Sequence, residues 1–254
     1  MSPMSRTRGA VAVAGLSAAL AHLLPVAVSL RPVRMSVLPA LAGIGTPGHV
    51  ALTFDDGPHP GSTPAYLRLL DQHRVRATFF VLGSKLAAHP GLGRDITAAG
   101  HEIALHGWTH RCLLRQGPAA TYRDLARGGE TITEVTGQRP RWFRAPYGVF
   151  TGASLGVAAL LGLRPVLWTS WGVDWTSRAT GSSVLAAVTR QLVGGGTVLL
   201  HDGDASAAPG AWRATVAALP GVLDLCRRRG LSVGPLCEHA VGATAPRRRP
   251  SRTP

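Results

Sequence analysis

The chain has 254 residues and a formal net charge of +14, with 27 basic residues against 13 acidic ones. This length fits one large domain with a substantial buried core, and no basic patch interleaved with aromatic side chains is present, which argues against nucleic-acid binding. Three cysteines without paired spacing suggest neither a disulfide framework nor a zinc ribbon.

Much of the positive charge lies at the two ends of the chain. Residues 1–47 and residues 240–254 each hold four arginines and no acidic residue. Residues 48–239 therefore carry 19 basic and 13 acidic side chains, a net charge of +6. We still expect the surface to attract acidic polymers such as cell-wall glycans or anionic lipid. We expect Cys112, Cys226 and Cys237 to be buried free thiols, with a Cys226–Cys237 disulfide as the alternative in an oxidising compartment.

A basic N-terminus, residues 1–8, precedes an apolar stretch at residues 9–30 that is long enough to cross a membrane. The small-residue sequence Ala40-Leu41-Ala42 lies too far beyond it to be a secretory cleavage site. An uncleaved anchor therefore fits better than a cleaved signal and predicts a membrane-anchored or exported protein. If translation starts at Met35 instead, the protein would be cytoplasmic.

Residues 31–47 are interpreted as a linker and residues 240–254 as a disordered basic tail. Between them, residues 48–239 alternate between strand-like and helix-like segments. The strands are predicted at residues 49–54, 76–82, 102–105, 141–143, 165–169, 197–200 and 231–233. The helices are predicted at residues 64–73, 91–99, 119–136, 151–162, 182–193 and 211–229.

This alternation predicts an α/β fold with a parallel sheet and crossover helices. The first strand is not followed by a Gly-x-Gly-x-x-Gly turn. We therefore expect a single domain built as a distorted (β/α) barrel of seven or eight parallel strands, and not a dinucleotide-binding sheet.

The first strand ends in two adjacent carboxylates, Asp55 and Asp56, followed by Gly57 and Pro58. Neighbouring carboxylates repel one another, and a bound cation or a basic partner would relieve that repulsion. One carboxylate is therefore a candidate metal ligand and the other a candidate proton carrier. A strand that simply ends in a turn is the alternative, because Asp, Gly and Pro are common turn formers.

His106 and His110 follow the strand at 102–105 and lie four residues apart. Neutral imidazole is a common zinc ligand, and a structural histidine pair is the alternative. In (β/α) barrels the loops after the strands build the active site. The position of both histidines after a strand therefore favours metal binding.

Three more predicted strands end in polar or aromatic side chains. These are Arg144-Ala145-Pro146-Tyr147 after 141–143, Trp171-Gly172-Val173-Asp174-Trp175 after 165–169, and His201-Asp202 after 197–200. Each alone could be a rigid turn or a packing residue. Five such strand ends together predict one active site at one mouth of the barrel.

The set of motifs resembles that of the polysaccharide deacetylases of carbohydrate esterase family four, the NodB-homology domain. Residues 53–58 read Thr-Phe-Asp-Asp-Gly-Pro as in the family, and residues 144–147 and 199–201 also match. Gly107 replaces a hydroxyl residue between the two histidines, and Trp171 stands where the family often has Asp. These departures put in doubt the substrate contacts and the hydrogen bonds that orient the metal ligands, but not the reaction type.

The resemblance implies a site that holds one divalent metal ion, zinc, with cobalt, nickel or manganese as alternatives. Its ligands would be Asp56, His106 and His110. Asp55 would be the general base, and Arg144 would hold its orientation.

For the remaining residues, the resemblance implies three further roles. His201 would protonate the departing amine, and Asp174 would orient and tune this imidazole. The backbone N–H of Tyr147 would stabilise the oxyanion. Tyr147, Trp175 and Leu199 would contact the substrate, with Trp175 and Leu199 as the walls of the acetyl pocket.

The implied function is the removal of acetyl groups from N-acetylated sugars of a chitin-like or peptidoglycan-like polysaccharide, with release of acetate. The alternatives are an O-acetyl esterase acting on xylan and a non-catalytic sugar-binding protein on the same fold. An acetylated glycan is the expected partner, nucleic acid is not, and the oligomeric state is left open.

Side chains outside the motifs receive structural interpretations. We expect His59, His73, His89 and His239 to lie at the surface and His101 to be structural. Cys112, two residues after His110, is a weaker candidate metal ligand.

Overall fold

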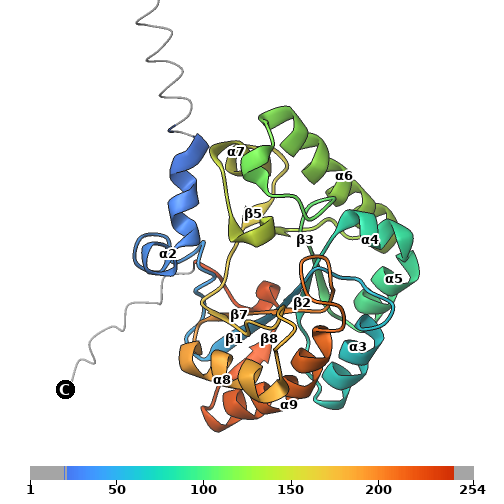
Figure 1. The fold of residues 1–254 in the computed structure, drawn as a ribbon, viewed down its shortest axis with the longest axis vertical. Coiled ribbons are helices and arrows are strands. Elements are labelled where there is room, and N and C mark those ends of the chain that lie inside the picture. Colours follow the sequence, from blue (N-terminus) through green and yellow to red (C-terminus); the bar gives the residue numbers. More distant parts are fainter. Residues whose placement is uncertain (1–19, 21, 243–254) are drawn as a thin grey trace, which may run out of the picture.

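The computed structural model describes residue 20 and residues 22–242. Its strands are β1 His49–Asp55, β2 Thr78–Val81, β3 Glu102–Leu105, β4 Trp142–Phe143, β5 Arg164–Pro165, β6 Ser170–Trp171, β7 Thr197–His201 and β8 Ser232–Gly234. Their order in the sheet is β5-β4-β3-β2-β1-β7-β6, and β8 pairs with the first half of β1. Every pairing is parallel. The curled sheet with helices around it (Figure 1) confirms the predicted α/β barrel.

The outer layer consists of helices that connect successive strands. They are α3 Thr63–Gln72, α4 Gly83–Ala88, α5 Pro90–Ala98, α6 Pro118–Thr136, α7 Gly152–Leu160, α8 Gly181–Gln191 and α9 Trp212–Arg228. Short 3-10 turns lie at η1 Leu24–Ser29, η2 Leu113–Arg115, η3 Pro146–Gly148 and η4 Leu236–Glu238. Thr151 and Thr180 begin α7 and α8 with reciprocal capping boxes, which satisfy N–H groups that the helices leave free.

The prediction of a strand at 165–169 is wrong, because most of this stretch connects the two edges of the sheet. β5 and β6 are the edge strands, and residues 166–169 run from one to the other. Five residue steps span at most about 18 Å, so the sheet must curl until its edges nearly meet. We call residues 166–169 the seam segment.

The linker predicted at 31–47 is also wrong, because this stretch packs on the barrel. It contains helix α2, Arg31–Val37, whose Arg34 is 3% exposed. The carbonyl of Leu41 accepts a hydrogen bond from the backbone N–H of Leu167 in the seam segment. The arginines that suggest a solvated linker instead donate to backbone carbonyls of the barrel.

Part of the predicted membrane anchor, residues 9–19 and 21, lies outside the described residues. Within the part that the structure describes, no helix combines the length and apolarity needed to cross a bilayer. The tail predicted at 240–254 lies outside as well from residue 243 onward. Val241 is buried, and its carbonyl accepts a hydrogen bond from the Arg164 guanidinium.

Alternation along β1 separates the outer core from the barrel interior. Val50, Leu52 and Phe54 belong to the large apolar cluster that the helices cover. The intervening Ala51 belongs to a second cluster with Phe80, Ala104, Trp142, Val166, Leu236 and Val241. Because side chains alternate along a strand, Asp55 shares the inward face with Ala51, and it does so at the end where β1 stops.

The structure corrects the predicted exposure of His239 and of two cysteines. His239 is fully buried, and its Nδ1 lies 2.8 Å from Nδ1 of His49, so the prediction of a surface residue is wrong. The three cysteines are free, but only Cys226 is buried, whereas Cys112 is half-buried and Cys237 is exposed.

Candidate active site

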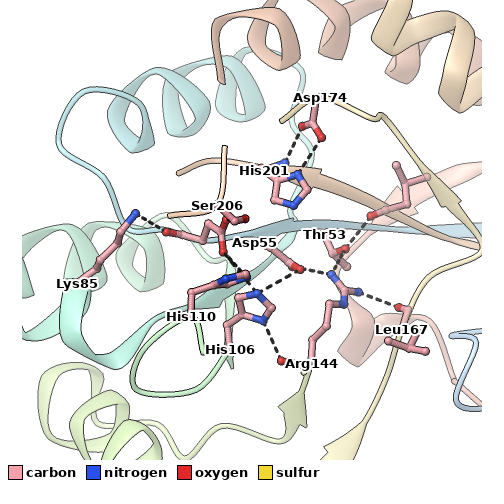
Figure 2. A network of polar contacts seen from close by, with 12 residues as sticks. Thr53, Asp55, Lys85, His106, His110, Arg144, Leu167, Asp174, His201 and Ser206 are labelled. Carbon is pink, nitrogen blue, oxygen red and sulfur yellow. Dashed lines mark hydrogen bonds and ion pairs between the residues drawn. The ribbon is translucent and has the colours of Figure 1, made fainter. Parts of the chain in front are cut away.

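The three predicted metal ligands lie together at the carboxyl ends of the strands. Oδ1 of Asp56 is 3.4 Å from Nε2 of His106 and 3.4 Å from Nε2 of His110. One ligand atom from each residue lies within 4.8 Å of the others. Figure 2 shows Asp55 between His106 and His201. Cys112 is not part of the group.

The chemistry of these side chains fits a metal ion. Oδ1 of Asp56 is buried and has no hydrogen-bond partner among the described residues. Nδ1 of His106 lies 2.8 Å from the Arg144 carbonyl, so it donates its hydrogen there and leaves the Nε2 lone pair directed at Asp56. Burial lowers the pKa of His110 to about 4, so its imidazole is neutral. For His106, burial lowers the pKa, but the Asp55 and Asp56 carboxylates outweigh burial and raise it, and a cation bound at Nε2 would displace that proton. One carboxylate and two imidazoles are a common zinc-binding set.

Two further side chains hold Asp56 in place, and the sequence reasoning missed both. The Ser206 hydroxyl donates to Oδ2 of Asp56 at 2.8 Å, and Oδ1 is thereby left for a ligand. The ammonium of Lys85, which is the sole lysine of the chain, donates to the backbone carbonyl of Asp56 at 2.9 Å.

Asp55 is held by a buried arginine. Nη1 of Arg144 donates to Oδ1 of Asp55 at 2.7 Å and to the Thr53 hydroxyl at 2.8 Å. Its Nη2 donates to the carbonyl of Leu167 in the seam segment at 2.9 Å. The guanidinium, which is fully buried, lies 4.0 Å from the centre of the Phe80 ring. These contacts fix the Asp55 carboxylate more firmly than an exposed ion pair would.

His201 forms the second acid–base pair. Its Nδ1 donates to Oδ1 of Asp174 at 2.8 Å, and its backbone N–H donates to Oδ2 at 2.8 Å. The hydroxyl of Thr215 from α9 also donates to Oδ2, at 2.6 Å. Burial alone would lower the pKa of His201, but the Asp174 carboxylate outweighs burial and raises that pKa to about 9. The imidazole is therefore protonated near neutral pH.

A cavity of about 240 Å³ lies in front of these groups. Its lining residues are His106, His110, Tyr147, Gly148, Trp168, Trp171, Trp175, Leu199, His201 and Ser206. Three tryptophan rings follow one another along one wall, with 5.8 Å between the centres of Trp168 and Trp171 and 4.9 Å between those of Trp171 and Trp175. Trp175 and Leu199 line this cavity together with His201, and Trp168 extends its apolar wall.

Several residues with a strained backbone lie in the loops of the site. Five non-glycine residues of the described chain have positive φ, and three of them, Asp56, Tyr147 and Val173, lie in the strand-end loops of the site. Such conformations cost on the order of 1–3 kcal/mol each and persist only where the surroundings enforce them. At Tyr147, with φ of 60°, the side chain is 58% exposed and its ring lies 4.4 Å from that of His110.

The glycine that departs from the family motif has a structural explanation. Gly107 has φ of +94°, a conformation that favours glycine, and a Cβ there would lie 2.8 Å from Oδ2 of Asp124. This carboxylate, from α6, accepts the backbone N–H of Trp108 at 2.9 Å. Asp124 therefore fixes the loop between His106 and His110, and no sequence motif indicated it.

Comparisons with known protein sequences match the chain to deacetylases that act on glycans. A family model described as polysaccharide deacetylase matches residues 43–166. A chitooligosaccharide deacetylase of Bradyrhizobium is 41% identical over 200 residues, which is 74% of this chain and 88% of that protein. The peptidoglycan-N-acetylglucosamine deacetylase PgdA of Listeria monocytogenes is 35% identical over 169 residues, which is 65% of this chain and 34% of PgdA. The chain thus spans about a third of PgdA.

A solved structure has the same fold. It is a family 4 carbohydrate esterase from Streptomyces lividans in complex with acetate, with a TM-score of 0.68 and 34% sequence identity. The match covers 78% of this chain and 98% of the esterase.

Proposed function

Because the chain belongs to the polysaccharide deacetylase family, we propose that it is a metal-dependent hydrolase that removes acetyl groups from N-acetylated sugars of a chitin-like or peptidoglycan-like glycan. The observation that carries this proposal is the convergence of three groups at the carboxyl ends of the strands, beside one cavity. They are the Asp56–His106–His110 cluster, the Asp55–Arg144 pair and the His201–Asp174 pair.

Asp56, His106 and His110 would hold the metal, which is zinc in this proposal. A bound divalent ion of this kind acidifies a water molecule and polarises the substrate carbonyl. Ser206 and Lys85 would keep Asp56 aligned for the ion through the two hydrogen bonds described above.

Asp55 would act as the general base and take a proton from the attacking water as the new C–O bond forms. Arg144 would keep its carboxylate directed into the cavity. His201, protonated through Asp174, would donate its Nε2 proton to the sugar nitrogen as the C–N bond breaks. The products are acetate and a free amino sugar. The backbone N–H of Tyr147 would donate to the developing oxyanion.

The apolar wall supports an acyl substrate. Trp175 and Leu199 present hydrocarbon surface to the side of the cavity next to His201, with 5.8 Å between the ring centres of Trp175 and His201. A methyl group buried there is stabilised by about 0.8 kcal/mol or more relative to water. The names of the relatives, which include chitooligosaccharide and peptidoglycan-N-acetylglucosamine deacetylases, support an N-acetylated glycan.

Acetate release from chitooligosaccharides, peptidoglycan and acetylxylan tests the proposal. We expect release from the first or second substrate, its loss after treatment with a chelator, and its return on adding zinc. Cobalt, nickel and manganese are compared in the same way. Release from acetylxylan alone would indicate the O-acetyl esterase alternative. Absence of release from all three would overturn the proposed activity, and activity that survives complete metal removal would overturn its metal dependence.

A further inference from the structure

The segment before β1 contacts the wall of the cavity. We call residues 28–42 the N-terminal brace. The Ser29 hydroxyl donates to the Gly148 carbonyl at 3.0 Å. Nε of Arg31 donates to the Thr169 carbonyl at 3.0 Å, and Nε of Arg34 donates to the Trp168 carbonyl at 3.1 Å. In Figure 1, α2 lies at the side of the barrel between α7 and α8.

Arg34 is the most buried of these donors, and its surroundings are specific. Its guanidinium lies 5.2 Å from the centre of the Trp168 ring and donates through Nη1 to the Ser29 carbonyl. One side chain therefore satisfies two carbonyls and packs against an aromatic ring. A buried arginine with this many fixed contacts restricts the atoms around it.

The residues that the N-terminal brace contacts belong to the cavity wall or lie next to it in the chain. Trp168 and Gly148 both line the cavity. Leu167, which precedes Trp168 in the seam segment, accepts a hydrogen bond from Arg144 through its carbonyl, and Arg144 holds Asp55. A Cβ on Gly148 would lie 2.6 Å from the Trp168 ring, so these two parts of the wall are already in close contact.

We propose that the N-terminal brace is part of the catalytic unit and that Arg34 is a positioning residue. It fixes the seam segment so that the Leu167 carbonyl keeps Arg144, and with it Asp55, in the reactive orientation. The contribution of the brace to turnover rests on the proposed deacetylase function, whereas its effect on the cavity wall does not.

The chain offers a matched control for Arg34. Arg164 also stacks on a tryptophan, 4.5 Å from the ring centre of Trp142, and also donates to a backbone carbonyl, that of Val241. Neither Trp142 nor Val241 lines the cavity; both belong to the barrel-interior cluster. An arginine-to-lysine change at either position removes a guanidinium stack on a tryptophan and a hydrogen bond to a carbonyl. Arg34 is buried and makes one further carbonyl hydrogen bond, whereas Arg164 is exposed.

The first measurement does not depend on activity. The six tryptophans are labelled with 5-fluorotryptophan in the full chain, and the resonances of Trp168 and Trp142 are assigned with Trp168→Phe and Trp142→Phe. In Arg34→Lys the Trp168 resonance should shift or broaden while that of Trp142 stays. The reverse should hold in Arg164→Lys. An unchanged Trp168 resonance in Arg34→Lys would overturn the proposal that the N-terminal brace holds the cavity wall.

The second measurement is turnover on the substrate that the wild-type enzyme accepts best. In Arg34→Lys kcat should fall about 10-fold, since small misplacements of reacting groups can cost up to 10², while the Kd for zinc stays within about twofold. Arg164→Lys should keep the wild-type kcat. If the Trp168 resonance changes and kcat does not, the positioning role is wrong and the brace serves stability alone.

Ser29→Ala provides a second test of the proposal if the Arg34 variant does not fold. It removes the single hydrogen bond to Gly148 and should lower kcat by a smaller factor with unchanged zinc affinity. Wild-type protein that releases no acetate from any glycan would overturn the proposed function and the claim about kcat. The fluorine spectra would then still decide whether the brace holds the cavity wall.

Discussion

Asp55 and Asp56 are chemically identical neighbours in different surroundings. Asp55 is paired with Arg144, whereas Asp56 has both histidines at 3.4 Å and the Ser206 hydroxyl on its other oxygen. Because a strand alternates its side chains and Asp56 departs from the strand with φ of 78°, the two carboxylates leave β1 in different directions. Their roles should therefore separate on substitution.

Asp56→Asn should weaken zinc binding, because an amide is a poorer ligand than a carboxylate, and excess zinc should restore part of the activity. Asp55→Asn should retain zinc but lose the general base, which is worth about 10²–10⁴-fold. Zinc titration and acetate release on both variants check this. Rescue of Asp55→Asn by zinc, without rescue of Asp56→Asn, would reverse the two assignments.

Asp174 should set the alkaline limit of activity through His201. The protonated imidazole is the proposed acid, so activity is present below its pKa of about 9 and is lost as pH rises through that value. Asp174→Asn removes the carboxylate that raises this pKa, so the alkaline limb of the kcat profile should move to lower pH. A limb that stays in place would mean that another group donates the proton.

At the scale of secondary structure, most strands and helices could be predicted because their apolar periodicity is local. The seam segment could not, because it reads as an apolar strand like its neighbours, and only the curvature of the whole sheet makes it a connection between edges. Helix α4 was missed because its six residues, Gly83–Ala88, give too short a pattern. The brace was missed because arginines usually indicate solvent.

The residues of the site also differ in whether the sequence could predict them. Residues at strand ends carry motifs, so Asp56, His106, Arg144 and His201 could be found from the sequence. Their supporting partners stand in helices and loops that only tertiary structure brings close: Lys85, Asp124, Ser206 and Thr215. Nothing in the local sequence distinguishes Ser206 from any other loop serine.

The loop that connects the two histidines gives a prediction at this scale. Gly107→Ala should lower the free energy of unfolding by more than about 1 kcal/mol, because alanine is strained at φ of +94° and its Cβ meets Asp124. It should also weaken zinc binding by displacing His106 or His110. The control is Gly117→Ala, where φ is −72° and a Cβ meets no other atom within 4 Å. Equal effects of the two changes on zinc affinity would contradict this interpretation.

For the molecule as a whole, the two ends of the domain meet at the mouth opposite the active site. Nε2 of His239 donates to the carbonyls of Gly43 and Gly195, so its Nδ1 accepts from Nδ1 of His49. Burial, and then the neighbouring His49, lower the pKa of His239 to about 4. Burial also lowers the pKa of His49, although Glu238 opposes that effect.

A histidine whose folded pKa is lowered stabilises the fold above its unfolded pKa, and that stability is lost as pH falls. The thermal midpoint should therefore decline between about pH 6.5 and pH 4. In His239→Gln the midpoint should be lower at neutral pH but depend less on pH over this window. His89→Gln, at an exposed position, is the control and should keep the wild-type slope. An unchanged slope in His239→Gln would exclude the pair as the acid-sensitive element.

The N-terminal brace should also affect how the enzyme responds to a pulling force. A force that pulls on the N-terminal end reaches the bonds of Ser29, Arg31 and Arg34 before it reaches β1, which is paired along both edges. Detachment of these 15 residues would release up to about 50 Å of chain. In an optical trap this extension should precede unfolding of the barrel, and turnover should slow at that same force. Under tension, the enzyme would stop working before it lost its fold.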